Sequence, residues 1–157
     1  MLTDRGLTPQ IAALAISLFG GASLLGRIAN GFLADRFSAP LVAAGIFSGA
    51  AIGILLLWLY PTGFTVYLAT VMIGLAMGAE SDIMPYMVSR FFGMRSMGTV
   101  YGFVFSAYTI GAAFGPMLFG VGFDKTGSYQ FSLLVGLGLM IIAIGLMLLL
   151  QKNTKVE

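Results

Sequence analysis

Five apolar runs, each of 20 or more residues, make up most of the 157-residue chain. A helix of that length rises about 30 Å, at about 1.5 Å per residue, and can cross the hydrocarbon core of a bilayer. Charge clusters and Pro/Gly turns separate the runs, which cover about residues 8–34, 39–60, 64–88, 97–123 and 129–150. The pattern predicts an all-α membrane protein with five transmembrane helices.

The composition agrees with this class and argues against several others. Hydrophobic residues make up 59% of the chain and charged residues 9%, whereas ordinary globular domains carry about 25% charged residues. Cysteine and histidine do not occur, so we expect no cofactor and no metal site. The net charge of +2 is scattered along the chain and does not indicate nucleic-acid binding. Glu80 and Asp82, two apart on a helix, do not face each other as a catalytic pair would, which disfavours an enzyme.

The distribution of basic residues predicts the orientation in the membrane. Lys and Arg are enriched in cytoplasmic loops. Only Arg5 and Lys125 fall on one side of the five spans, and that side is therefore expected to be outside. The other side, expected to be cytoplasmic, carries Arg36, Arg90, Arg95, Lys152 and Lys155. The N-terminus is thus expected outside and the C-terminus in the cytoplasm.

Two of the apolar runs end in the same skeleton, Gly-x4-Gly-x3-Asp-(Arg/Lys). One copy is Gly26, Gly31, Asp35 and Arg36; the other is Gly115, Gly120, Asp124 and Lys125. Three membrane crossings separate the copies, so they face opposite sides of the bilayer, as inverted repeats of secondary transporters do. A repeat unit of three helices would lack its opening helix in the first copy. Chance is the alternative, because glycine is common in membrane helices and Asp-Arg often ends a span.

Several segments resemble one family of transporters. Residues 31–37 (GFLADRF) resemble the loop motif Gly-x3-Asp-(Arg/Lys) of the major facilitator superfamily. Residues 85–93 (PYMVSRFFG) and 98–102 (GTVYG) are similar to its oxalate/formate antiporter and monocarboxylate porter branch, as are residues 111–116 (GAAFGP) and 122–129 (GFDKTGSY). One departure is clear: the family motif continues with glycine and two basic residues, whereas Ser38, Ala39 and Pro40 follow here.

The resemblance implies a place in a larger architecture. The five spans correspond to helices eight to twelve of a twelve-helix transporter, and so to part of its C-terminal six-helix bundle. Helix seven and the N-terminal half are then missing partners. The bilayer implied is the bacterial inner membrane. Gly31, Asp35 and Arg36 are the implied gating-loop residues.

Arg27 is the candidate substrate-binding residue. It precedes Asp35 by eight residues, about 12 Å of helix, which places it near mid-membrane. Ser23 and Asn30 share its helix face. A guanidinium matches a carboxylate, and the resemblance implies that an arginine of helix eight recognises the substrate carboxylate. The alternative is a structural ion pair with Glu80 or Asp82.

The same resemblance limits what can be carried over. Animal monocarboxylate porters place an acidic coupling residue where Ser23 stands. Oxalate-type porters place a lysine about where Tyr108 stands, so a dicarboxylate is less expected than a monocarboxylate.

Glu80 and Asp82 are the candidate proton-coupling residues, Glu80 first. Both lie inside an apolar run, where acidic residues are rare. Burial disfavours an ionised carboxylate and a nearby arginine favours it, so a carboxylate between these effects can take up and release a proton. A static pair between Arg27 and Glu80 is the alternative.

Three further patterns bear on the helices. Tyr101, Phe105 and Tyr108 share a face that we interpret as a cavity wall, with substrate contacts from the two tyrosines; plain helix packing is the alternative. Pro85 and Pro116 are expected to kink their spans. The spacing of Gly45, Gly49 and Gly53 predicts close helix packing.

These patterns together favour a secondary active transporter of small organic anions, chiefly monocarboxylates, by proton symport or anion exchange. The chain is expected to be an incomplete piece that works with lipid, a proton and the missing half. Proton-coupled efflux of drugs or metabolites is the alternative substrate class. A non-transporting fragment and a small oligomeric channel or assembly protein are the alternatives from other classes.

Overall fold

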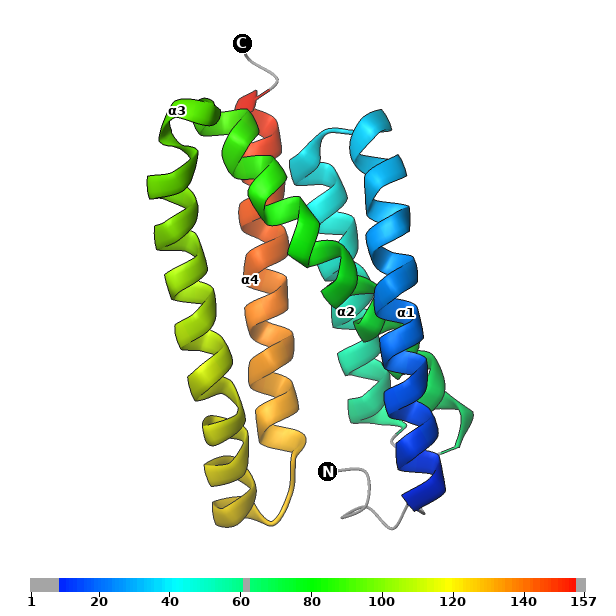
Figure 1. Ribbon diagram of the computed structural model, residues 1–157. Coiled ribbons are helices and arrows are strands. Elements are labelled where there is room, and N and C mark those ends of the chain that lie inside the picture. The colour runs from blue at the N-terminus through cyan, green and yellow to red at the C-terminus, as the bar shows by residue number, and fades with distance from the viewer. Residues whose placement is uncertain (1–8, 61–62, 155–157) are drawn as a thin grey trace.

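The computed structural model describes residues 9–60 and 63–154. These residues form four α-helices and no strand: α1 (Pro9–Arg36), α2 (Ala39–Leu59), α3 (Phe64–Thr126) and α4 (Gln130–Thr154). All four are long and apolar enough to cross a membrane. The helices lie roughly side by side, with the start of α1 and the end of α4 at opposite ends of the bundle (Figure 1). The all-α class is confirmed.

Helix α3 is two membrane-length arms joined by a sharp bend. Gly93 is the break, with φ 73° and ψ 165° inside the 63-residue helix. This backbone conformation is essentially restricted to glycine. The first arm (residues 64–92) rises obliquely across the bundle, and the second arm (residues 94–126) descends beside α4 (Figure 1). With the two arms counted separately, the chain crosses the bundle five times.

The prolines do not break their helices. Pro85 and Pro116 lie inside α3, where the only non-helical backbone is at Gly93. The change of direction therefore occurs at the glycine, which can adopt a positive φ, and not at the prolines that the sequence singled out. Pro40 is in the first turn of α2, where a missing N–H costs no helical hydrogen bond.

The first arm of α3 is the centre of the packing. It contacts both α1 and α2, and α2 in turn packs against α4. Backbones approach closely where glycines face a neighbour: a Cβ on Gly26 would overlap the Leu75 carbonyl, and one on Gly53 would lie 2.8 Å from the Ile73 side chain. Gly45 and Gly49 have no such neighbour within 4 Å. Of the three glycines predicted to pack closely on α2, only Gly53 does.

The second arm of α3 is the least covered part of the bundle. Residues 102–114 are all exposed. At the hairpin that leads into α4, the rings of Phe123 and Tyr129 stack with centroids 4.4 Å apart. Gly127 ends α3 in a left-handed conformation, with φ 65°. The two long helices therefore diverge from a tight turn and leave space between them and the first arm.

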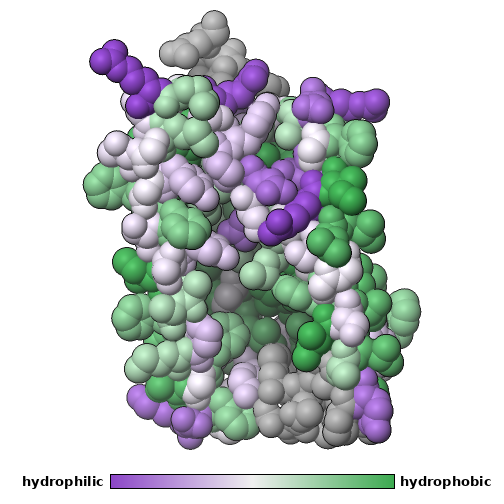
Figure 2. Space-filling model, in the orientation of Figure 1, coloured by the Kyte–Doolittle hydropathy of each residue, from purple (hydrophilic) through white to green (hydrophobic). Residues whose placement is uncertain are grey.

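The surface has the character of a membrane protein. Large apolar side chains are exposed on every helix, among them Ile16, Phe103 and Leu139. Figure 2 shows hydrophilic residues gathered at the two ends of the bundle and in the hollow on the displayed face, with apolar and intermediate residues over the rest of it. Exposed hydrocarbon of this extent requires a lipid environment.

Candidate transport site

The contact between α1 and the first arm of α3 sets the geometry of the site. A Cβ on Gly74 would lie 2.7 Å from the Phe19 carbonyl oxygen, and one on Gly78 would overlap the Ser23 carbonyl. Both pairs are separated by the same number of residues, so the two helices run in the same direction in this contact. Gly74 and Gly78 have the spacing typical of close helix packing in membranes.

This register does not continue along both helices. Gly26 of α1 meets the Leu75 carbonyl, six residues short of the register, because the first arm of α3 crosses α1 obliquely (Figure 1). The similar depth expected for Arg27 and Glu80 therefore stays a prediction.

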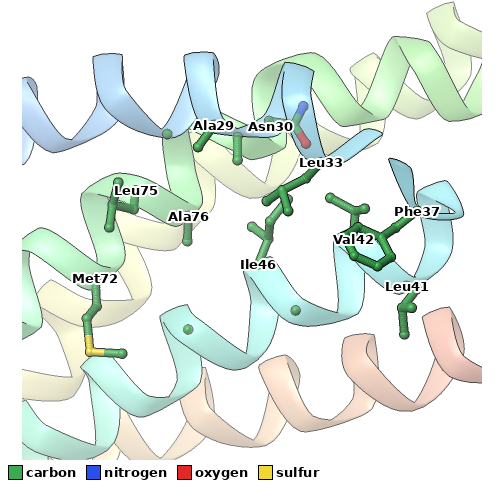
Figure 3. A pocket seen from close by; sticks show the side chains of 14 residues that line it. Ala29, Asn30, Leu33, Phe37, Leu41, Val42, Ile46, Met72, Leu75 and Ala76 are labelled. Carbon is green, nitrogen blue, oxygen red and sulfur yellow. The ribbon is translucent and has the colours of Figure 1, made fainter. Parts of the chain in front are cut away.

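The contact also has two unlike sides. On one side Ala29 and Leu33 of α1 face Leu75 and Ala79 of α3 across a pocket that α2 closes (Figure 3). Arg27 precedes Ala29 by two residues and so points about 200° away around α1. It therefore lies on the opposite side of the contact.

Glu80 lines a small pocket on that opposite side. The pocket has a volume of about 150 Å³ and lies between the two arms of α3. Its walls are formed by Met77, Glu80, Ser81, Met84, Tyr101, Phe105 and Tyr108. We call it the Glu80 pocket. By the helical geometry, Arg27 and this pocket are on the same side of the α1–α3 contact.

An aromatic ladder forms the second-arm wall of the Glu80 pocket. The ring centroids of Tyr101 and Phe105 are 5.7 Å apart, and those of Phe105 and Tyr108 are 6.0 Å apart. Because the three rings support one another along the helix, both tyrosines face the first arm together. The structure therefore brings together Glu80, Tyr101 and Tyr108, which lie in different predicted spans.

A larger apolar pocket adjoins Glu80 on its other flank. It has a volume of about 550 Å³ and lies between α2, α4 and both arms of α3. Met84, Met87, Phe91 and Met147 are among its lining residues, and Glu80 is the only charged one. We call it the methionine pocket. Glu80 thus stands between an aromatic compartment and an apolar one.

The charged candidates do not pair with one another. Arg27 and Asp82 are exposed and Glu80 is half-buried. Within residues 9–60 and 63–154, no ion pair joins Arg27 to Glu80 or Asp82. The static Arg27–Glu80 pair is therefore not formed in this conformation, which leaves both groups available to other partners.

Ser23 and Asn30 differ from Arg27 in their surroundings. Ser23 is half-buried in the contact with Gly78. Asn30 is only 3% exposed and lines the pocket between α1 and α2. The expected polar stripe on α1 is therefore divided: Arg27 opens toward the Glu80 side, and Asn30 opens toward the other.

The loop-motif residues Gly31, Asp35 and Arg36 are all exposed at the end of α1. Next to these residues, Ser38 Oγ donates a hydrogen bond to Gln151 Oε1 of α4. Sequence reasoning missed this bond, because nothing local to Ser38 indicates a partner at the far end of the chain. It also missed Met77, Ser81 and Met84, whose positions depend on how the two arms of α3 fold back.

Comparison with known proteins identifies the family. A sequence profile described as Major Facilitator Superfamily matches residues 1–157. The chain belongs to the Major Facilitator Superfamily. Proteins of this superfamily are transporters and are generally not enzymes, and the apolar helices make this chain an integral membrane protein.

Several characterised superfamily members are similar to the chain. It is 28% identical to monocarboxylate transporter 11 of Mus musculus, over 84% of this chain and 32% of that protein. It is 29% identical to the nitrite extrusion protein of Bacillus subtilis, over 79% of this chain and 31% of that protein. It is 25% identical to an MFS-type transporter of Gibberella moniliformis, over 87% of this chain and 33% of that protein. The chain spans about a third of the length of these relatives, and no solved structure matches it.

Proposed function

We propose that this chain is part of a secondary active transporter that moves a small organic anion, chiefly a monocarboxylate, by proton symport or anion exchange. The proposal rests on one observation: Arg27 is exposed, makes no ion pair with Glu80 or Asp82 among the described residues, and by helical geometry lies on the same side of the α1–α3 contact as the Glu80 pocket. The names of two relatives, monocarboxylate transporter 11 and the nitrite extrusion protein, support the substrate class, since monocarboxylate and nitrite are both anions.

In this proposal Arg27 binds the substrate anion. Its guanidinium is permanently charged and offers paired N–H donors that match the two oxygens of a carboxylate. An arginine within a membrane helix without an acidic partner is costly. An incoming anion would offset that cost. The site should therefore bind anions in preference to neutral solutes.

Glu80 carries the coupled proton in this proposal, with Asp82 as the second candidate. A carboxylate that stands between an aromatic and an apolar pocket is costly when charged and easily neutralised by a proton. Tyr101 and Tyr108 contact the apolar part of the substrate or the protonated Glu80 through their hydroxyls. The gating loop of this proposal, at the end of α1, contains Gly31, Asp35 and Arg36.

The missing partners complete the mechanism. We propose that helix seven and an N-terminal half cover the open side of Arg27 and the second arm of α3, and that the two halves rock about the site. The chain would lie in a bacterial inner membrane with α1 beginning outside and α4 ending in the cytoplasm.

Reconstituted transport tests this proposal. The assembly that contains this chain would be purified from its native membrane, placed in liposomes and given a pH gradient, with labelled monocarboxylates of two to four carbons. Wild type should accumulate a monocarboxylate. Glu80→Gln should lose gradient-driven accumulation and retain exchange of internal for external anion, with Asp82→Asn less affected.

Two results would count against it. Unchanged accumulation in Glu80→Gln would remove the coupling role from Glu80. A native assembly that contains only this chain and moves no anion would favour a non-transporting fragment.

Proton-coupled efflux of an apolar drug or metabolite is the second candidate. The methionine pocket favours it, because methionine-rich surfaces adapt to apolar ligands of varied shape. Competition tests this candidate. An apolar neutral solute should inhibit monocarboxylate uptake only if the solute and the monocarboxylate bind at the same site.

A further inference from the structure

The pocket between α1 and α2 holds a polar group without a partner. Asn30 is 3% exposed, and its Oδ1 accepts no hydrogen bond from the part of the chain that the structure describes. In Figure 3 the Asn30 side chain lies at the α1 edge of the pocket, with the amide oxygen turned toward the interior. A buried acceptor of this kind costs free energy until a donor reaches it.

The rest of the pocket is apolar and open. We call it the lateral pocket; its volume is about 470 Å³, within the range of small-molecule sites. Leu33, Ile46 and Met72 are among its walls. Gly45 and Gly49 also line it, and a Cβ on either would meet nothing within 4 Å. The protein's own side chains therefore leave this space unfilled.

The lateral pocket is separate from the proposed transport site. It lies on the side of the α1–α3 contact away from Arg27, and none of its lining residues also lines the Glu80 pocket or the methionine pocket. Asn30 precedes the end of α1 at Arg36 by six residues, about 9 Å along the axis. A ligand here would enter from the hydrocarbon of one leaflet.

The shape of the lateral pocket disfavours a partner helix. Phe37 and Leu41 line it where α1 and α2 are joined by the two-residue link 37–38. The link lies at that end of the pocket, whereas a spanning helix needs a groove that continues across the membrane. An apolar pocket with one polar side chain among its lining residues instead fits a chain-like molecule.

The chemistry of the ligand follows from Asn30. Hydrocarbon offers no donor, and lipid ester carbonyls only accept hydrogen bonds. We propose that the lateral pocket binds a hydroxyl-bearing lipid of the surrounding bilayer, with its O–H donated to Asn30 Oδ1 and its apolar chain lying along Gly45 and Gly49. This inference does not depend on the proposed transport function.

Photolabelling with a matched pair of competitors tests the proposal. The full chain in nanodiscs of phosphatidylcholine would be labelled with a long-chain alcohol that carries a diazirine, and the labelled residues mapped by mass spectrometry. We expect labelling in α1 and α2 around the lateral pocket. Dodecanol should compete about fivefold more strongly than dodecyl methyl ether, which accepts but does not donate a hydrogen bond.

Three variants sharpen the test. Asn30→Leu should abolish the preference for dodecanol over its ether. Gly49→Leu leaves Asn30 intact and fills the lateral pocket from α2, so labelling should be lost. Gly20→Leu is the control, because Gly20 also has open space around it but does not line the lateral pocket; its labelling should match wild type.

Three outcomes would overturn the proposal. Equal competition by the alcohol and the ether would show that no donor is recognised. Labels spread evenly over all lipid-facing helices, and unchanged by Gly49→Leu, would show only partition into the bilayer. A crosslink from the lateral pocket to a second copy or to another protein, in place of lipid labelling, would assign it to a partner helix.

Discussion

At the scale of single residues, Arg27 and Glu80 lie on one side of a helix contact and do not pair with each other. A partner within the protein would hold each charge in place. Without it, Arg27 is exposed and Glu80 stands between two pockets. This arrangement suits a site that must bind and release charged species in turn.

Substitution of Arg27 tests the anion-binding role. Arg27→Gln should raise the KM for a monocarboxylate about tenfold or more, because a hydrogen bond to a charged group contributes about 1.5–3 kcal/mol. Arg27→Lys keeps the charge and loses the paired donors, so its KM should lie between the two. Initial rates of uptake over a range of substrate concentrations give these values. A KM for Arg27→Gln equal to wild type would exclude direct contact.

The sequence singled out these charged residues more clearly than their polar neighbours. Arg27 and Glu80 stand out as charges in apolar runs, and helical rise predicts a similar depth for both. The sequence could not predict that Asn30 and Arg27 face different sides of the contact, because the two residues lie within one helical turn. The helices that cross α1 decide which side each residue faces. Tyr101 and Tyr108 were recognised as one face, but their opposition to Glu80 depends on the bend at Gly93.

At the scale of elements, the glycines of the first arm of α3 set how close α1 can lie. Gly78→Leu would force its side chain into the Ser23 carbonyl, and overpacking of this kind typically costs about 1–3 kcal/mol. We expect a clear loss of thermal stability in detergent. Gly45→Leu, on α2 with open space around it, is the matched control and should unfold close to wild type. Equal losses in both variants would contradict the packing.

The bend in α3 can be tested in the same way. Gly93→Ala places a side chain at φ 73° and ψ 165°, at a cost of about 1–3 kcal/mol. Gly98→Ala, in the helical second arm, should be neutral or stabilising because alanine favours helix over glycine. Thermal unfolding of both variants is the measurement. A Gly93→Ala protein as stable as Gly98→Ala would mean that the bend does not need glycine.

Helices were predictable from the sequence because long apolar runs leave few alternatives in a membrane. Contacts between helices were less predictable. The Gly45, Gly49 and Gly53 spacing indicated packing, yet the closest contacts come from Gly74 and Gly78, which have the same spacing. Glycine spacing shows where a helix can be approached closely, and the fold decides which of these surfaces is used.

At the scale of the whole molecule, the two copies of the repeated skeleton are in unequal surroundings. Gly26 of the first copy is packed against the first arm of α3, whereas Gly115 of the second has no atom within 4 Å of an added Cβ. In an inverted repeat, the helix equivalent to the first arm would cover Gly115. We propose that helix seven does so, which accounts for the exposure of the second arm.

The proposed transport path requires that the Glu80 side of the α1–α3 contact faces water and that the Ala29 side faces lipid. The chain has no cysteine, so single cysteines can be introduced without background. Ser81 and Ala29 are both exposed, on opposite sides of the α1–α3 contact. In native membranes, a charged thiol reagent should modify Ser81→Cys and leave Ala29→Cys unmodified, and a monocarboxylate should slow the first reaction. Modification of Ala29→Cys as fast as Ser81→Cys, or of neither, would contradict a transport path along Glu80.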